Sequence, residues 1–269
     1  MSSILRPTPA QRTRRLVVLA TAAFAVVVAY GQMGLGLGQT AAEFSADSDA
    51  TLKVAGWAFS IWGIIYLGLL AYAVRQVLPQ TGESPMINRL GWPSAAAMLG
   101  IGWWIIAAAL DWEIGTILLI FGSAIVLIVP LLLNAATVRA LPRWDRDRWL
   151  VVWPLSLLAG WLTIAAPVNL LTVLTGNGDL PAALSPTLWA ILAVVVVSVL
   201  ALAITAQLRI PAYALPIAWG LIGAFAAEQS RNPTLAFAAL AAAIAVIVGT
   251  VVLVLRLRAG VEKPRPSET

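Results

Sequence analysis

The chain of 269 residues contains no cysteine and no histidine. Without cysteine it can form no disulfide and offers no thiolate to a metal ion. Without histidine it lacks the commonest metal ligand, a frequent general base and the usual axial ligand of haem iron. Charged residues are also scarce, at 11% of the chain, against roughly 25% in soluble domains. We therefore expect no metal site, no cofactor and no large soluble domain.

Hydrophobic residues are correspondingly abundant. They make up 61% of the chain, whereas soluble domains have roughly 45–50%. This composition predicts an all-α polytopic membrane protein in contact with the lipid bilayer. The net charge of +5 does not indicate nucleic-acid binding, because the basic residues lie in short loops between apolar runs, where they set orientation in a membrane.

Eight apolar segments are each close to the ~20 residues that a helix needs to cross a bilayer. They cover residues 16–37, 54–78, 92–110, 114–137, 149–174, 187–208, 211–227 and 233–255. The seventh is the weakest, since it is short and contains Pro211 and Pro216. With the N-terminus inside, every Lys and Arg except Lys53 and Arg231 lies on the inner side. This bias predicts eight transmembrane helices with both termini cytoplasmic.

The segments contain no ionisable residue far from their ends. Glu228 is at the outer end of the seventh segment, and Arg75 and Arg209 are at inner ends, where long side chains can reach water. Ion-coupled transporters usually carry ionisable groups at mid-membrane. The pattern disfavours such a transporter and an enzyme with a buried carboxylate, and favours an apolar, aromatic interior that binds a lipophilic molecule.

Aromatic residues recur at helical spacing in the second and fifth segments. The second contains GWAFSIWGIIY, with Trp62 and Tyr66 four residues apart and therefore on one helix face. The fifth contains Trp161, Ala165 and Asn169 at the same spacing. Several of the twelve tryptophans suit the aromatic belt at a membrane surface. Others, including Trp62, Trp104 and Trp161, lie well inside segments, where packing against a neighbouring helix is the alternative to a ligand site.

With WPLSLLAGWLTIAAPVN in the fifth segment, these motifs resemble the tryptophan-rich sensory proteins, the TspO/MBR family that includes the translocator protein. The prolines that this family usually has after its first aromatic pair are absent, because Ser60 and Ile61 stand there. The resemblance covers residues 16–175 and implies a five-helix core, with a basic N-terminus at 1–15, three additional helices at 176–258 and a cytoplasmic tail at 259–269. This arrangement is typical of a longer bacterial branch, so the resemblance implies a bacterial inner membrane.

The resemblance also implies a function and a site. Family members bind porphyrins and other lipophilic molecules, so we expect a membrane receptor or sensor for tetrapyrroles or similar ligands. The implied pocket residues are Trp57, Phe59, Trp62, Tyr66, Trp104, Trp161, Ala165 and Asn169. An interhelical hydrogen bond is an equal alternative for Asn169. A transporter of a neutral hydrophobic molecule is the second functional hypothesis, an enzyme the least favoured, and a homodimer is possible.

Overall fold

The computed structural model describes residues 7–46, 49–78 and 84–259, and these residues form helices and connecting turns without a β-strand. The prediction of an all-α protein is therefore confirmed. The long helices are α1 (Pro9–Leu35), α3 (Ile61–Val77), α4 (Pro85–Ala109), α5 (Glu113–Leu133), α7 (Trp153–Gly176), α8 (Pro186–Leu208), α9 (Ala214–Glu228) and α10 (Pro233–Ala259). Short helices are α2 (Ala41–Ala46), η1 (Gly56–Ser60), α6 (Ala135–Ala140), η2 (Arg148–Val152) and η3 (Pro211–Tyr213).

Polar caps and prolines determine where several helices begin. Thr8 and Gln11 form a reciprocal capping box at the start of α1, and Ser84 and Ser185 accept hydrogen bonds from the first turns of α4 and α8. Each cap is followed by proline, whose fixed φ suits the first helical position. Helices α1 and α4 therefore begin before residues 16 and 92, where hydropathy alone places them. Most of the predicted 259–269 tail lies outside the described residues.

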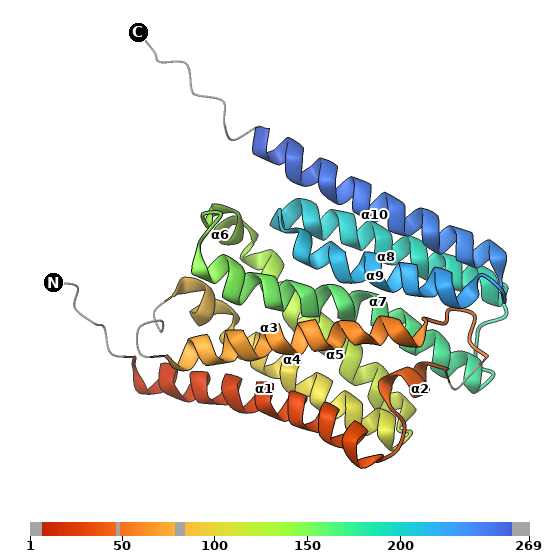
Figure 1. Cartoon of the computed structure of the whole chain (residues 1–269), viewed down its shortest axis with the longest axis horizontal. Coiled ribbons are helices and arrows are strands. Elements are labelled where there is room, and N and C mark those ends of the chain that lie inside the picture. Colours follow the sequence, from red (N-terminus) through yellow and green to blue (C-terminus); the bar gives the residue numbers. More distant parts are fainter. Residues whose placement is uncertain (1–6, 47–48, 79–83, 260–269) are drawn as a thin grey trace, which may run out of the picture.

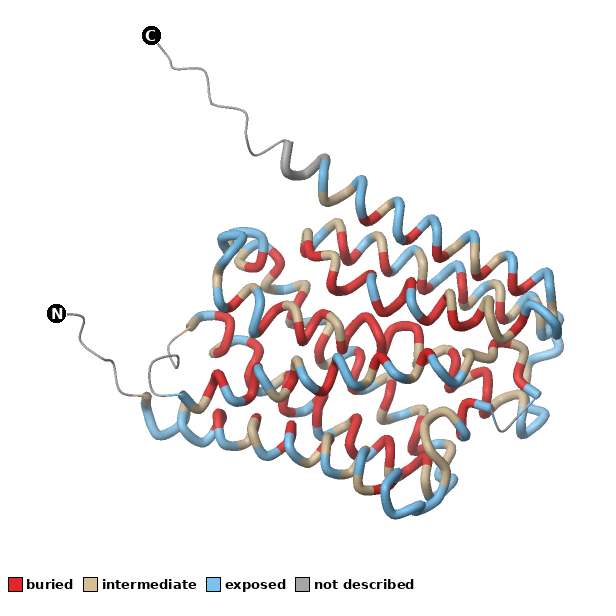
Figure 2. Tube along the Cα trace, viewed as in Figure 1, coloured by how far each residue is buried: buried red, intermediate tan, exposed pale blue. Residues whose placement is uncertain are grey.

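Helix α7 lies at the centre of the bundle (Figures 1 and 2). In its most apolar window 72% of residues are buried, compared with 22% in α1 and in α10. Helices α1, α3, α4 and α5 pack together with α7, and α8, α9 and α10 form a second group that contacts α7 mainly through α9. We call the two ends of the bundle the α2 end and the α6 end. Helix α1 begins, and α10 ends, at the α6 end.

Seven helices among the described residues are long and apolar enough to cross a membrane. The predicted segment 211–227 corresponds to η3 and α9, and α9 has only 15 residues. It is not among these seven, although it packs against α7, α8 and α10. Membrane-spanning helices are thus confirmed, whereas the count of eight stays a prediction.

The expectation that charged residues avoid burial at the segment ends is wrong in two places. Arg75 is 8% exposed and forms a buried ion pair with Asp147, which also accepts a hydrogen bond from Ser84. Glu228 is 1% exposed at the α2 end, where Arg231 donates to it. Asp147 and Glu228 are both stabilised by these partners, so the charged groups at the two helix ends are buried as pairs and do not reach water.

Candidate functional site

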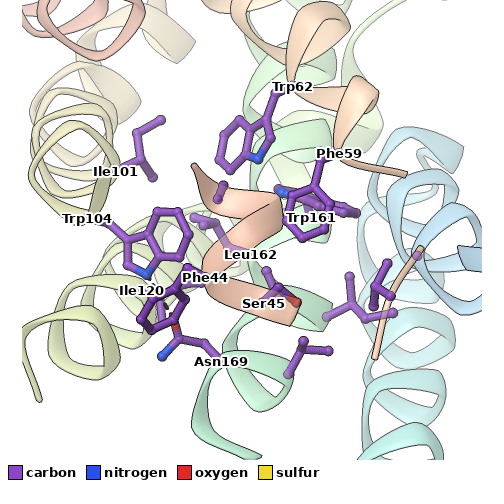
Figure 3. A pocket seen from close by; sticks show the side chains of 16 residues that line it. Phe44, Ser45, Phe59, Trp62, Ile101, Trp104, Ile120, Trp161, Leu162 and Asn169 are labelled. Atoms are coloured by element: carbon purple, nitrogen blue, oxygen red, sulfur yellow. Dashed lines mark hydrogen bonds between the residues drawn. The ribbon is translucent and has the colours of Figure 1, made fainter. Parts of the chain in front are cut away.

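A small cavity lies in the half of the bundle nearest the α2 end, against the central helix α7 (Figure 3). Its volume is about 40 Å³. The lining side chains come from α2, η1, α3, α4, α5, α7 and α9, and include Phe44, Ser45, Phe59, Trp62, Ile101, Trp104, Ile120, Trp161, Leu162, Ala165 and Asn169. The predicted stripe of Trp161, Ala165 and Asn169 therefore faces one cavity. We call this space the inner cavity.

A larger cavity of about 360 Å³ adjoins the inner cavity. The two share Ala41, Phe59, Trp62 and Trp104 in their walls. The larger one extends between α1 and α3 and is also lined by Tyr66. Its residues Tyr30, Met33 and Gly63 are exposed, so it opens on the side of the bundle between these two helices. We call it the lateral cavity.

Aromatic rings meet across the boundary between the two cavities. The rings of Trp62 and Tyr66 stack at 5.2 Å, which confirms that they share one helix face. The rings of Trp62 and Phe59 each form an edge-to-face pair with the ring of Trp161. The centroid-to-centroid distances are 6.2 Å for Trp62 and 5.9 Å for Phe59. Trp62 of α3 and Trp161 of α7 therefore face each other at this boundary. Such edge-to-face pairs contribute roughly 0.5–1.5 kcal/mol each beyond the area they bury.

Trp57 is the one predicted site residue that lines neither cavity. It is 47% exposed, and its ring forms an edge-to-face pair with that of Trp219 from α9, with the ring centroids 4.9 Å apart. Trp57 and Phe59 lie two residues apart in the 3-10 helix η1, so their side chains leave the helix about 120° apart. Phe59 therefore points toward Trp161 while Trp57 points toward α9.

Asn169 connects three helices through its side-chain amide. Its Oδ1 accepts a hydrogen bond from Trp104 Nε1 at 3.0 Å, and its Nδ2 donates to Thr116 Oγ1 at 3.0 Å. These bonds link α7 to α4 and α5, as the interhelical alternative for Asn169 predicted. Asn169 also lines the inner cavity, so it sets the position of the Trp104 ring in the cavity wall.

Two buried polar atoms in the inner cavity have no hydrogen-bond partner among the described residues. They are Nε1 of Trp161 and Oγ of Ser45, whose residues are 3% and 7% exposed. A buried donor without a partner costs about 1–3 kcal/mol. The cavity thus presents one N–H and one hydroxyl within apolar and aromatic walls, as in sites that bind lipophilic molecules with a few polar groups (Figure 3).

The sequence prediction missed helix α2, which covers the inner cavity at its end. Phe44 of α2 is 3% exposed and lies edge-on to Trp104 at 6.1 Å. Thr40 and Glu43 form a capping box at the start of this helix, and the hydrogen bonds from Thr40 lower the pKa of the Glu43 carboxyl. The Thr40-x-x-Glu43 spacing before an aromatic residue is the sequence signal from which this helix could have been predicted.

Helix α9 also contributes to the site, although it belongs to the additional helices. Its Gly220 lines the inner cavity. Its Trp219 Nε1 donates to the carbonyl of Ala58 at 2.8 Å, and its Gly223 carbonyl accepts from the backbone of Ala55 at 3.0 Å. These bonds hold η1 in place, so the additional helices support the cavity wall that carries Phe59.

Comparison with known proteins gives one result. No curated protein and no solved structure matches the chain. A family model described as TSPO-like protein matches residues 14–252, which include α8, α9 and most of α10 in addition to the region 16–175. Together with the aromatic stripes of α3 and α7, this match shows that the chain belongs to the TSPO-like family.

Proposed function

We propose that the protein is a membrane receptor or sensor for a lipophilic molecule that carries a hydrogen-bond acceptor. The unpartnered Trp161 Nε1 in an aromatic cavity is the observation that carries this proposal. A ligand carbonyl, ether or carboxylate at this position would pair the N–H and recover the cost of its burial. Ser45 offers a second hydrogen bond from the helix that covers the cavity. We assign the protein no catalytic role.

Cavity size limits how a ligand occupies the site. Ligand pockets usually measure roughly 300–1,000 Å³. The lateral cavity, at about 360 Å³, falls in this range, whereas the inner cavity, at about 40 Å³, does not. We propose that a tetrapyrrole would enter from the bilayer between α1 and α3, and would reach Trp161 only if α2 or the Trp62 side chain moves.

The proposed topology has eight crossings in a bacterial inner membrane, with both termini cytoplasmic. Helix α9 alone spans about 22 Å, and the three residues of η3 add about 6 Å. The sum approaches the ~30 Å hydrocarbon core. Helix α9 then crosses from the α6 end to the α2 end. A homodimer is a further proposal, and the oligomeric state of the detergent-solubilised protein tests it.

The proposal is tested by titration with protoporphyrin IX and by a flux assay. We expect saturable binding to the purified protein, measured by the absorbance of the porphyrin. Proteoliposomes should show no porphyrin flux above that of protein-free vesicles. Saturable flux would favour the transporter hypothesis, and the absence of saturable binding of porphyrin and of smaller lipophilic ketones would refute both.

A further inference from the structure

The wall of the lateral cavity contains a hydroxyl group that the fold itself does not use. Tyr66 of α3 is 4% exposed and lines this cavity. Its described interactions are ring contacts with Trp62 and Tyr30, and its hydroxyl forms no hydrogen bond to any described residue. Burying a hydroxyl without a partner is unfavourable, and an acceptor on a ligand would offset this cost. Tyr66 is therefore a hydrogen-bond donor for a molecule in the lateral cavity.

A second tyrosine lies at the mouth of the lateral cavity, between α1 and α3, which run side by side (Figure 1). Tyr30 of α1 is 48% exposed, and its ring centroid is 5.9 Å from that of Tyr66. It lies five residues before Leu35, the end of α1, or about 7 Å along the helix axis. The 27 residues of α1 span about 40 Å, which exceeds the ~30 Å hydrocarbon core. The mouth is therefore near the edge of this core and opens to lipid.

The two aromatic cavities have neutral walls. None of the described residues that line the lateral or the inner cavity is charged. An ionised group that is buried among apolar side chains needs a counter-charge, whereas a neutral polar group needs only a hydrogen bond. The part of a ligand that enters these cavities is therefore neutral.

The lateral cavity also has a flat aromatic wall. The rings of Trp62 and Tyr66 stack at an angle of 21° with their centroids 5.2 Å apart, and both residues line the cavity. Flat rings pack on such a surface by offset stacking or by edge-to-face contact. The cavity volume of about 360 Å³ is near the lower end of the usual range for ligand pockets, roughly 300–1,000 Å³. These features suit one flat ring system of moderate size.

We propose that the lateral cavity binds the headgroup of a lipid quinone, with one carbonyl oxygen accepting from the Tyr66 hydroxyl and the tail leaving past Tyr30 into the bilayer. A quinone headgroup is flat and neutral, and its carbonyl oxygens accept hydrogen bonds. Its long apolar tail keeps it in the membrane, so it reaches the mouth from the lipid. This inference rests on the proposed function, because it names the class of lipophilic molecule that these cavities bind.

The test is binding of three ligands to the immobilised, detergent-solubilised protein, with the bound ligand eluted and quantified by chromatography. Decyl-ubiquinone should bind saturably. Decylbenzene retains a ring and the tail but lacks an acceptor, and its Kd should be about 2- to 12-fold higher, the range for one neutral hydrogen bond. 4-Decylbenzoate has acceptors but carries a charge, and its Kd should be at least about tenfold higher because the cavity offers no counter-charge. All three are compared at the same mole fraction in the detergent micelles.

Two tyrosine variants of α3 form a matched pair. Tyr66→Phe removes the hydroxyl from the lateral cavity and should raise the Kd for decyl-ubiquinone about 2- to 12-fold. Tyr72→Phe removes a hydroxyl from the same helix, but Tyr72 lines neither cavity and its hydroxyl is hydrogen-bonded to Ser94 Oγ at 2.7 Å. This control should be less stable than the wild type and should keep the wild-type Kd.

The outcomes separate this inference from the proposed function. Absence of saturable decyl-ubiquinone binding by a protein that binds protoporphyrin IX would overturn the quinone assignment and leave the proposed function standing. Equal Kd values for decyl-ubiquinone and 4-decylbenzoate would overturn the requirement for a neutral headgroup. Equal effects of Tyr66→Phe and Tyr72→Phe on the Kd would overturn the role of Tyr66. If Tyr66→Phe fails to fold, the three ligands decide with the wild-type protein, since a Kd for decylbenzene as low as that for decyl-ubiquinone would exclude a carbonyl contact.

Discussion

Two tryptophan-to-phenylalanine variants test whether an indole N–H in the cavity stabilises the fold or binds the ligand. Trp104 and Trp161 are 7% and 3% exposed and line the same cavity. Trp104→Phe and Trp161→Phe remove the same atoms. Only Trp104 loses a hydrogen bond, the one to Asn169 Oδ1 at 3.0 Å, since Trp161 Nε1 has no partner in the described residues.

The expected magnitudes follow from this difference. A side-chain hydrogen bond within a membrane helix bundle contributes about 0.6–1.7 kcal/mol, so Trp104→Phe should be less stable than Trp161→Phe by about this amount. In a chain of this size 1 kcal/mol corresponds to about 2–4 °C in the unfolding midpoint. Porphyrin affinity should respond to Trp161→Phe: a neutral hydrogen bond contributes about 0.5–1.5 kcal/mol, or roughly 2- to 12-fold in Kd.

Thermal unfolding in detergent measures the first quantity. Porphyrin absorbance measures the second, because protein fluorescence changes whenever a tryptophan is removed. A Trp161→Phe variant that is less stable than Trp104→Phe would mean that the Trp161 N–H is already paired in the free protein. Unchanged porphyrin affinity in a folded Trp161→Phe variant would refute the assignment of this N–H to the ligand.

Two further predictions concern the scaffold. A Cβ added at Gly160 meets the carbonyl oxygen of Tyr213, whereas one added at Gly122 meets nothing within 4 Å; Gly160→Ala should therefore cost about 1–3 kcal/mol, and Gly122→Ala should leave the unfolding midpoint unchanged or raise it. Equal midpoints for the two variants would contradict the close packing of α7 on η3. Asp147→Asn should cost about 3–5 kcal/mol because it removes the negative charge that faces the buried Arg75 guanidinium, and the double variant Asp147→Leu with Arg75→Met should recover most of the loss. A double variant no more stable than the single one would show that the charges themselves are needed.

Side-chain periodicity predicted the parts of the site that lie on regular helices. Trp161 and Asn169 share a face because eight residues make about two turns, and the inner cavity is on that face. Trp57 and Phe59 were implied by the family resemblance and not by periodicity, and residues two apart do not share a face in an α-helix or in a 3-10 helix. Phe59 lines the cavity whereas Trp57 does not, so the prediction failed at Trp57.

Contacts between distant segments were outside the reach of sequence patterns. Arg75 and Asp147 are 72 residues apart, and neither the pairing nor its burial leaves a local signal. Helix α9 is short and contains Pro216, so hydropathy gave no indication that it supports η1 through Trp219. The cover formed by α2 had a capping signal but is too short to show periodicity.

The central claim is that a lipophilic ligand occupies the aromatic cavity at Trp161, and Ala165→Val tests it most directly. Ala165 lines the inner cavity on the same stripe as Trp161, and valine adds two methyl groups there without changing charge or hydrogen bonding. The variant should fold with an unfolding midpoint equal to or above that of the wild type, because apolar groups fill a void. Its Kd for protoporphyrin IX, measured by absorbance titration, should rise at least about tenfold as the space is lost. A folded Ala165→Val variant with wild-type affinity would place the ligand outside this cavity and contradict the account.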